Sequence, residues 1–126
     1  MAQDITADAL NQIKNAKKAR KEVVKIKRYS KLLLELLQIM KLKRYVHSYK
    51  VDVKEKTVEI SIGDILECRS IKPRFYVKKN ELEKYIRRFL PSRNYGVIII
   101  STNKGLMTHH DAIDQNLGGS LIAYFY

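Results

Sequence analysis

Residues 96–105 have the sequence GVIIISTNKG, and the interpretation of the fold begins from this stretch. The four apolar residues 97–100 form a continuous run, which is typical of a β-strand buried on both faces of a sheet. Two hydroxyls, an amide and a cation follow at consecutive positions, and Gly105 lets the backbone turn or approach a ligand closely. The stretch therefore predicts a buried strand that delivers a polar loop, residues 101–105, to the protein surface.

The residues on both sides of this strand predict a small α+β lobe. Asn80 is expected to cap a helix, because the apolar residues after it recur at helical spacing. Pro73 favours an edge or a bend in an extended segment, since proline lacks the backbone N–H that a sheet needs. In order, the predicted elements are an extended segment at 65–79, a helix at 81–89, the strand at 97–100, a short helix at 108–116 and a final strand at 121–126.

The first half of the chain predicts another α+β lobe. Ser30 is a suitable N-cap for its second helix, because a serine hydroxyl can accept a hydrogen bond from a free backbone N–H. Within residues 22–27, Val24 and Ile26 alternate with Lys25 and Lys27, which predicts a strand with one buried and one basic face. The predicted order is a helix at 4–16, the strand at 22–27, a helix at 31–43 and a hairpin of 49–53 with 58–62.

The predicted fold class is therefore α+β, with two small lobes of different element order. Residues 1–64 are expected to form a lobe in the order helix, strand, helix, hairpin. Residues 65–126 are expected to form a lobe in the order strand, helix, strand, helix, strand, and to carry the main binding loop. Gly63 and Asp64 mark the boundary, because they form a break between the hairpin and the extended segment.

The charge balance of the chain indicates the kind of partner. The 126 residues include 25 Lys and Arg against 13 Asp and Glu, so the formal net charge is +12. An excess of that size is not needed for solubility and indicates a polyanionic partner, most often a nucleic acid. A basic protein without such a partner is the alternative. The hydrophobic share of 45% argues against wholesale disorder.

Within the sequence, no set of residues predicts catalysis, a metal site or a cofactor. Cys68 is the single cysteine, so no disulfide can form within the chain, and burial in the core is expected for it. His109 and His110 are adjacent on a predicted helix, where neighbouring side chains diverge, so they make a poor chelating pair. We therefore expect a protein that is not an enzyme. Neither a signal peptide nor an apolar span of ~20 residues is seen, so a cytoplasmic location is expected.

A dense basic segment follows the first predicted helix. Between Lys14 and Lys31 there are nine Lys and Arg residues and a single acidic residue, Glu22. Such a density neutralises phosphates whatever the base sequence of the partner, although a solvated basic surface is the alternative. The candidate RNA-binding residues here are Lys14, Asn15, Lys17, Lys18, Arg20 and Lys21.

Two further stretches combine cations with groups that can contact RNA. In residues 71–79 cations and aromatic residues are interleaved, which lets phosphates meet charges while a ring stacks on a base. Phe75 and Val77 are expected to point inward. The candidates on the opposite face are Lys72, Arg74 and Tyr76, and Arg93 adds a further cation. The loop contributes Ser101, Thr102, Asn103, Lys104 and Gly105, for which an ordinary polar turn is the alternative.

Three stretches resemble one known family. Residues 101–109, STNKGLMTH, are similar to the signature loop of ribosomal protein S8 of the small subunit, which usually reads STSKG, then Val or Ile, then MT. Residues 116–126, NLGGSLIAYFY, resemble the family's Gly-Gly strand with its aromatic end, and residues 8–16 resemble its first helix. Residues 71–75 and 89–96 resemble the archaeal and eukaryotic branch. The resemblance covers essentially the whole chain.

Two positions depart from that family pattern. Asn103 stands where serine is usual, and its amide is longer than a hydroxyl, so the contact there is expected to differ in detail. Residues 49–68 look shorter and more charged than the archaeal pattern, which affects the expected hairpin length more than the expected function.

The resemblance implies a two-lobed protein that binds the central domain of small-subunit rRNA and assists assembly of the subunit. It implies that Ser101, Thr102 and Asn103 enter an irregular internal loop of that RNA, while the N-terminal helix contacts a further rRNA element. The implied partners are this rRNA and neighbouring small-subunit proteins, with no membrane and no small-molecule substrate. Some bacterial members also repress their own mRNA. A translational repressor that binds mRNA, or another RNA-binding module outside the ribosome, is therefore the alternative.

Overall fold

The computed structural model describes residues 5–71, 76–92 and 95–126, which form two compact units. The first unit comprises residues 1–68 and the second comprises residues 69–126. Both units combine helices with an antiparallel sheet, so the predicted α+β class is confirmed.

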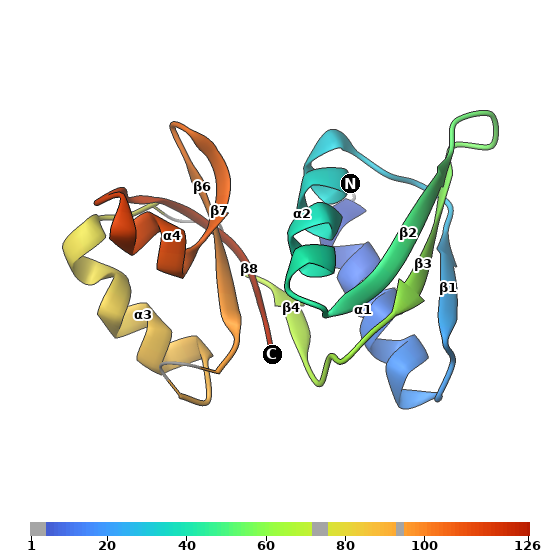
Figure 1. The fold of residues 1–126 in the computed structure, drawn as a ribbon, viewed down its shortest axis with the longest axis horizontal. Coiled ribbons are helices and arrows are strands. Elements are labelled where there is room, and N and C mark those ends of the chain that lie inside the picture. The colour runs from blue at the N-terminus through green and yellow to red at the C-terminus, as the bar shows by residue number, and fades with distance from the viewer. Residues whose placement is uncertain (1–4, 72–75, 93–94) are drawn as a thin grey trace. The chain divides into compact units, whose positions relative to one another are not determined.

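In the first unit, two helices lie on one face of a three-stranded antiparallel sheet (Figure 1). The strand order is β1-β3-β2, so the hairpin strand β3 is central. The elements are α1 (Ile5–Lys18), β1 (Val23–Ile26), α2 (Lys31–Leu42), β2 (Val46–Asp52) and β3 (Thr57–Ile62).

The apolar periodicity of the first unit accounts for its packing. Leu10 and Ile13 of α1 lie one turn apart and are fully buried, as are Leu33 and Leu37 of α2. The Ser30 hydroxyl accepts a hydrogen bond from the Leu33 N–H at 3.2 Å, which confirms the predicted cap of α2. The observed helices and strands of this unit overlap the predicted ones throughout.

In the second unit, a sheet in the order β4-β8-β6-β7 has the short strand β5 paired to β8. Both helices lie on the same side of this sheet (Figure 1). The strands are β4 (Cys68–Ser70), β5 (Tyr76–Val77), β6 (Val97–Thr102), β7 (Gly105–Thr108) and β8 (Gly119–Phe125). The two α-helices are α3 (Leu82–Phe89) and α4 (His109–Asp114), and a 3-10 turn, η1 (Lys79–Glu81), precedes α3.

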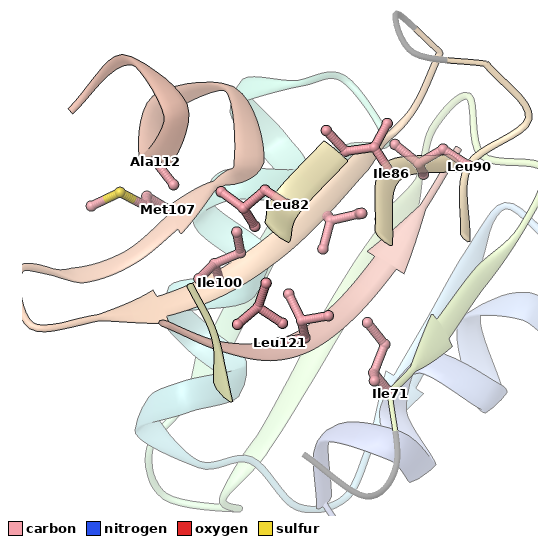
Figure 2. Packing of buried hydrophobic residues seen from close by; sticks show 10 residues of the cluster. Ile71, Leu82, Ile86, Leu90, Ile100, Met107, Ala112 and Leu121 are labelled. Atoms are coloured by element: carbon pink, nitrogen blue, oxygen red, sulfur yellow. The ribbon is translucent and has the colours of Figure 1, made fainter. Parts of the chain in front are cut away.

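The core of the second unit lies between its helices and its sheet. Leu82 and Ile86 of α3 belong to one buried cluster with the strand residues Ile100 and Leu121 (Figure 2). Residues 97–100 are all buried, which confirms the prediction of a strand with two covered faces. This central strand carries the predicted polar residues at its end.

The structure differs from the prediction in three places in the second unit. Asn80 does not cap α3: it lies within the 3-10 turn, and the N-terminus of α3 has no side-chain cap bond. The predicted loop at 101–105 is the end of β6, a two-residue turn and the start of the unpredicted strand β7. The extended segment at 65–79 contains two short strands, and Pro73 lies outside the described residues.

Candidate functional site

The turn between β6 and β7 is held by the hydroxyl of Thr102. The Thr102 hydroxyl donates a hydrogen bond to the Gly105 carbonyl oxygen at 2.9 Å and accepts one from the Lys104 N–H at 3.1 Å. Gly105 has a φ of +108°, a conformation that favours glycine. The hydroxyl of Thr102 therefore orders the turn. The hydrogen bonds found within the turn do not involve the side chains of Ser101 or Asn103.

A cleft of about 590 Å³ lies beside this turn, within the second unit. Sheet pairing brings its walls together: Tyr76 of β5 pairs with Ser120 of β8, and Ser120 pairs in turn with Ser101 of β6. Directly paired residues of antiparallel strands share a face, so these three side chains form a row across three strands. The cleft is lined by Tyr76, Lys78, Lys79, Asn80, Ser101, Thr102, Asn103, Asn116, Leu117, Gly118 and Gly119.

Glycine at the start of β8 keeps the strands close at this cleft. A Cβ atom at Gly119 would collide with the backbone carbonyl oxygen of Ser101, and one at Gly118 would collide with the carbonyl oxygen of Val77. The Gly-Gly pair thus lets β5, β8 and β6 converge below the row of polar side chains. The role of the pair is to let the backbones of neighbouring strands approach closely.

The cleft offers cations, amides and an exposed ring, and among the described residues that line it there is no carboxylate. Lys78 and Lys79 are exposed and can neutralise phosphates. The Asn80 and Asn103 amides supply both donors and acceptors, which suits sugar hydroxyls and base edges. Tyr76 is 68% exposed, so its ring is available for stacking. These groups fit a single-stranded or irregular nucleic acid better than a small organic molecule.

Of the residues predicted for binding, the structure brings four together in the cleft: Tyr76, Ser101, Thr102 and Asn103. Lys104 lies in the adjoining turn and Gly105 begins β7, and neither residue lines the cleft. Three further predicted cations, Lys72, Arg74 and Arg93, lie outside the described residues.

In the first unit, the predicted basic segment divides into engaged and exposed side chains. The Lys14 ammonium forms a salt bridge with Glu67 at 2.7 Å, and the Lys17 ammonium donates to the Gly63 carbonyl oxygen at 3.1 Å. Lys18, Arg20 and Lys21 are exposed at the end of α1. Asn15 and Lys21 line a groove of about 510 Å³ beside β1. Lys17 is exposed as well, but its ammonium already has a partner, so Lys18, Arg20 and Lys21 are the better candidates for contact with a polyanion.

Sequence reasoning left Lys78, Lys79, Asn80 and Asn116 out of the predicted site. Lys78 and Lys79 were visible as the end of the basic stretch at 71–79, but nothing in the pattern places them near residue 101. That neighbourhood results from the pairing of β5 with β8. Asn116 has a φ of +56°, and an asparagine just before a Gly-Gly pair is a usable signal for such a turn.

Of the two adjacent histidines, His109 has a structural role and His110 is exposed. The expectation that their rings diverge is wrong, because the ring centroids lie 3.9 Å apart. His109 is fully buried, and its Nδ1 accepts a hydrogen bond from the Ile98 N–H at 3.0 Å, which ties α4 to β6. Within the described ranges, no group of three or more His, Cys, Asp or Glu side chains is arranged to hold a metal ion.

Cys68 is buried, as predicted, and its thiol donates to the Leu10 carbonyl oxygen at 3.1 Å. Burial, reinforced by the negative charge of Glu67, raises the pKa of the Cys68 thiol from 9.0 to about 12, although the nearby Lys14 acts in the opposite direction. The folded thiol thus keeps its proton at pH values where the unfolded thiol has lost it. The protonated thiol therefore contributes to the free energy of unfolding. This contribution is complete below pH 9 and declines as the pH rises toward 12.

We expect the wild-type chain to lose more stability than Cys68→Ala between pH 8 and pH 10. The difference should be on the order of 1 kcal/mol. Over about one pH unit the folded thiol is protonated and the unfolded thiol is not, and each such unit changes the free energy of unfolding by about that amount. Urea unfolding of both proteins at the two pH values measures it, and the titration of lysines and tyrosines is common to both. Equal losses would show that the folded thiol ionises as freely as the unfolded one.

Fold and site together define a class: a strongly basic α+β protein whose polar cleft presents cations, amides and an aromatic ring without a carboxylate. The chain belongs to the family described as ribosomal protein S8, whose family model matches residues 4–126. A relative, small ribosomal subunit protein uS8 of the archaeon Nanoarchaeum equitans (strain Kin4-M), is 40% identical over 129 residues, and the match covers the whole of both chains.

Membership of this family gives the chain a structural role in the small ribosomal subunit, and the family is not one of enzymes. In the part of the chain that the structure describes, no helix is long and apolar enough to cross a membrane.

Proposed function

We propose that the chain binds the central domain of small-subunit rRNA and assists assembly of the subunit, with the cleft of the second unit as its specific site. The observation that supports this most directly is the convergence of Tyr76, Lys78, Ser101 and Asn103 on one cleft without a carboxylate. These residues come from β5, the segment after it, the end of β6 and the turn that follows.

The chemistry of RNA explains why a cleft of this kind selects a site. Regular RNA duplexes hide their base edges in a deep and narrow groove, so side chains read unpaired or irregular nucleotides instead. In the proposal, the Tyr76 ring stacks on an unpaired base or a sugar, and the Asn103 amide and Ser101 hydroxyl bond base edges and 2′-hydroxyls. Lys78 and Lys79 pair with the flanking phosphates.

The first unit supplies attraction that does not depend on base sequence. Lys18, Arg20 and Lys21 are exposed, and Asn15 lies beside Lys21 in the groove along β1. Each cation that neutralises a phosphate displaces a condensed counterion, which makes the affinity depend on salt. Lys14 and Lys17 contribute mainly through their partners within the unit, Glu67 and the Gly63 carbonyl.

The experiment that tests this proposal measures rRNA affinity over a series of salt concentrations. For a variant carrying Lys18→Gln, Arg20→Gln and Lys21→Gln, the slope of log affinity against log salt should fall by about 2–3 units, since each phosphate contact contributes roughly 0.7–0.9. The affinity itself should fall most at low salt.

A variant with Lys41→Gln, Lys43→Gln and Lys54→Gln is the matched control, because it removes the same charge from exposed positions outside the segment. We expect the slope of this control to remain within about one unit of the wild type. An unchanged slope in the first variant would show that its three cations do not contact phosphates. Absence of specific binding by the wild type would contradict the proposed function as a whole.

A further inference from the structure

Five aromatic rings form a continuous row on the second unit, away from the cleft. Ring centroids are separated by 6.3 Å between Tyr85 and Phe89, 5.2 Å between Phe89 and Tyr124, 6.4 Å between Tyr124 and Tyr126, and 6.0 Å between Tyr126 and Tyr95. We call Tyr85, Phe89, Tyr124, Tyr126 and Tyr95 the aromatic ladder. Four of its rings are half-buried and pack against the core of the unit, while Tyr95 is 47% exposed.

Two cations of α3 border the aromatic ladder. The Lys84 ammonium lies 5.8 Å from the centroid of the Tyr85 ring, and the Arg88 guanidinium lies 5.6 Å from that of Phe89. Arg87 is exposed on the same helix. A cation over an aromatic face is attracted by the ring quadrupole, so Lys84 and Arg88 are held in place before any partner arrives. The surface thus combines fixed rings with fixed positive charge.

The ladder and the cleft lie at opposite ends of the same strands. Tyr124 pairs with Ile98 at the start of β6, whereas Ser120 pairs with Ser101 near its end. Ser101 follows Ile98 by three residues on β6, which corresponds to about 10 Å along the strand. A ligand seated in the cleft therefore leaves the ladder uncovered unless the ligand extends along the whole strand.

Ring faces of the ladder are already covered by cations or by neighbouring rings, which favours a protein over RNA as the partner. Stacking on an RNA base needs a free aromatic face. Here Tyr85 and Phe89 have cations over their faces, and the rings stack on or tilt against one another. The rings are partly exposed and are bordered by exposed cations, and Tyr, Phe and Arg are residues enriched at protein–protein interfaces.

We propose that the aromatic ladder with Lys84 and Arg88 is a docking surface for the acidic face of another protein of the small subunit. Carboxylates of that partner pair with the two cations, and its aliphatic side chains pack against the aromatic rings. The proposal rests on the proposed function, because it assumes that rRNA occupies the cleft at the other end of the sheet.

Chemical modification in three states tests this surface. Tyrosine nitration with tetranitromethane, read by mass spectrometry, is applied to the free chain, to the chain bound to its small-subunit rRNA, and to complete native small subunits. Tyr95 should react in the free chain and in the rRNA complex, and its reactivity should fall at least about tenfold in the subunit. In the subunit, a zero-length carbodiimide should also link Lys84 to an Asp or Glu of another protein.

Tyr76 is the internal control, because its exposed ring belongs to the cleft. Its reactivity should already fall in the rRNA complex, and a Tyr76 that reacts equally in all three states would contradict the proposed function instead. Protection of Tyr95 by rRNA alone would show that RNA covers the ladder, and it would overturn the docking proposal. A Tyr95 that reacts as freely in the subunit as in the free chain would overturn it as well.

Discussion

Gly119→Ala is expected to lower the free energy of unfolding of the chain by about 2 kcal/mol or more. The added methyl group would collide with the backbone carbonyl oxygen of Ser101, and a backbone atom cannot move aside without disturbing the pairing of β8 with β6. Overpacking of this kind usually costs about 1–3 kcal/mol, and a backbone contact belongs to the upper part of that range. Urea unfolding followed by far-ultraviolet circular dichroism measures the change.

Gly105→Ala is the matched control for that prediction. A Cβ atom at Gly105 meets no atom within 4 Å, so its cost comes from the φ of +108° alone. We expect about 1–2 kcal/mol there, the typical cost of a left-handed backbone conformation for a residue with a side chain. A Gly119→Ala protein as stable as the wild type would show that β8 can move away from β6, and the description of the cleft floor would be wrong.

Tyr76→Ala is expected to weaken binding to small-subunit rRNA by about 1–3 kcal/mol, which corresponds to roughly 5–150-fold in affinity. The Tyr76 ring is largely exposed at the cleft, so its removal withdraws a stacking surface and little core packing. The slope of affinity against salt should stay the same, because no charge is lost. Filter binding at several salt concentrations measures both quantities.

Tyr76→Phe separates stacking from hydrogen bonding by the tyrosine hydroxyl. If the ring stacks, the phenylalanine variant should bind within about twofold of the wild type, since its π-face is retained. If Tyr76→Ala leaves the affinity unchanged, the ring does not contact RNA, and the cleft would act through its cations and amides alone.

Local sequence signals were sufficient where a pattern determines its own structure. The apolar run 97–100 and the Ser30 cap depend on neighbouring residues, and both were predicted correctly. The capping role predicted for Asn80 was wrong, because a 3-10 turn places it inside the helical segment and its side chain at the cleft. Strand β7 was missed, because four residues after a turn carry too short a pattern to distinguish from a loop.

The composition of the cleft could be predicted in part, and its assembly could not. Tyr76, Ser101, Thr102 and Asn103 were selected for their chemistry, whereas their common location depends on pairing between β5, β8 and β6. Lys14 and Lys17 also show that contacts between distant residues cannot be predicted from local sequence. Their charges were visible in the sequence, but Glu67 and the Gly63 carbonyl become their partners only through the fold of the first unit.

The central claim, that the cleft selects the RNA site while distant cations supply attraction, is tested most directly by a chemical footprint on the chain's own small-subunit rRNA. The wild type and a Ser101→Ala, Asn103→Ala variant are compared at concentrations that give equal total binding. We predict that the wild type protects an irregular, unpaired stretch of the central domain and that the variant loses this protection while still binding RNA. Unchanged protection of the same nucleotides by the variant would contradict the claim.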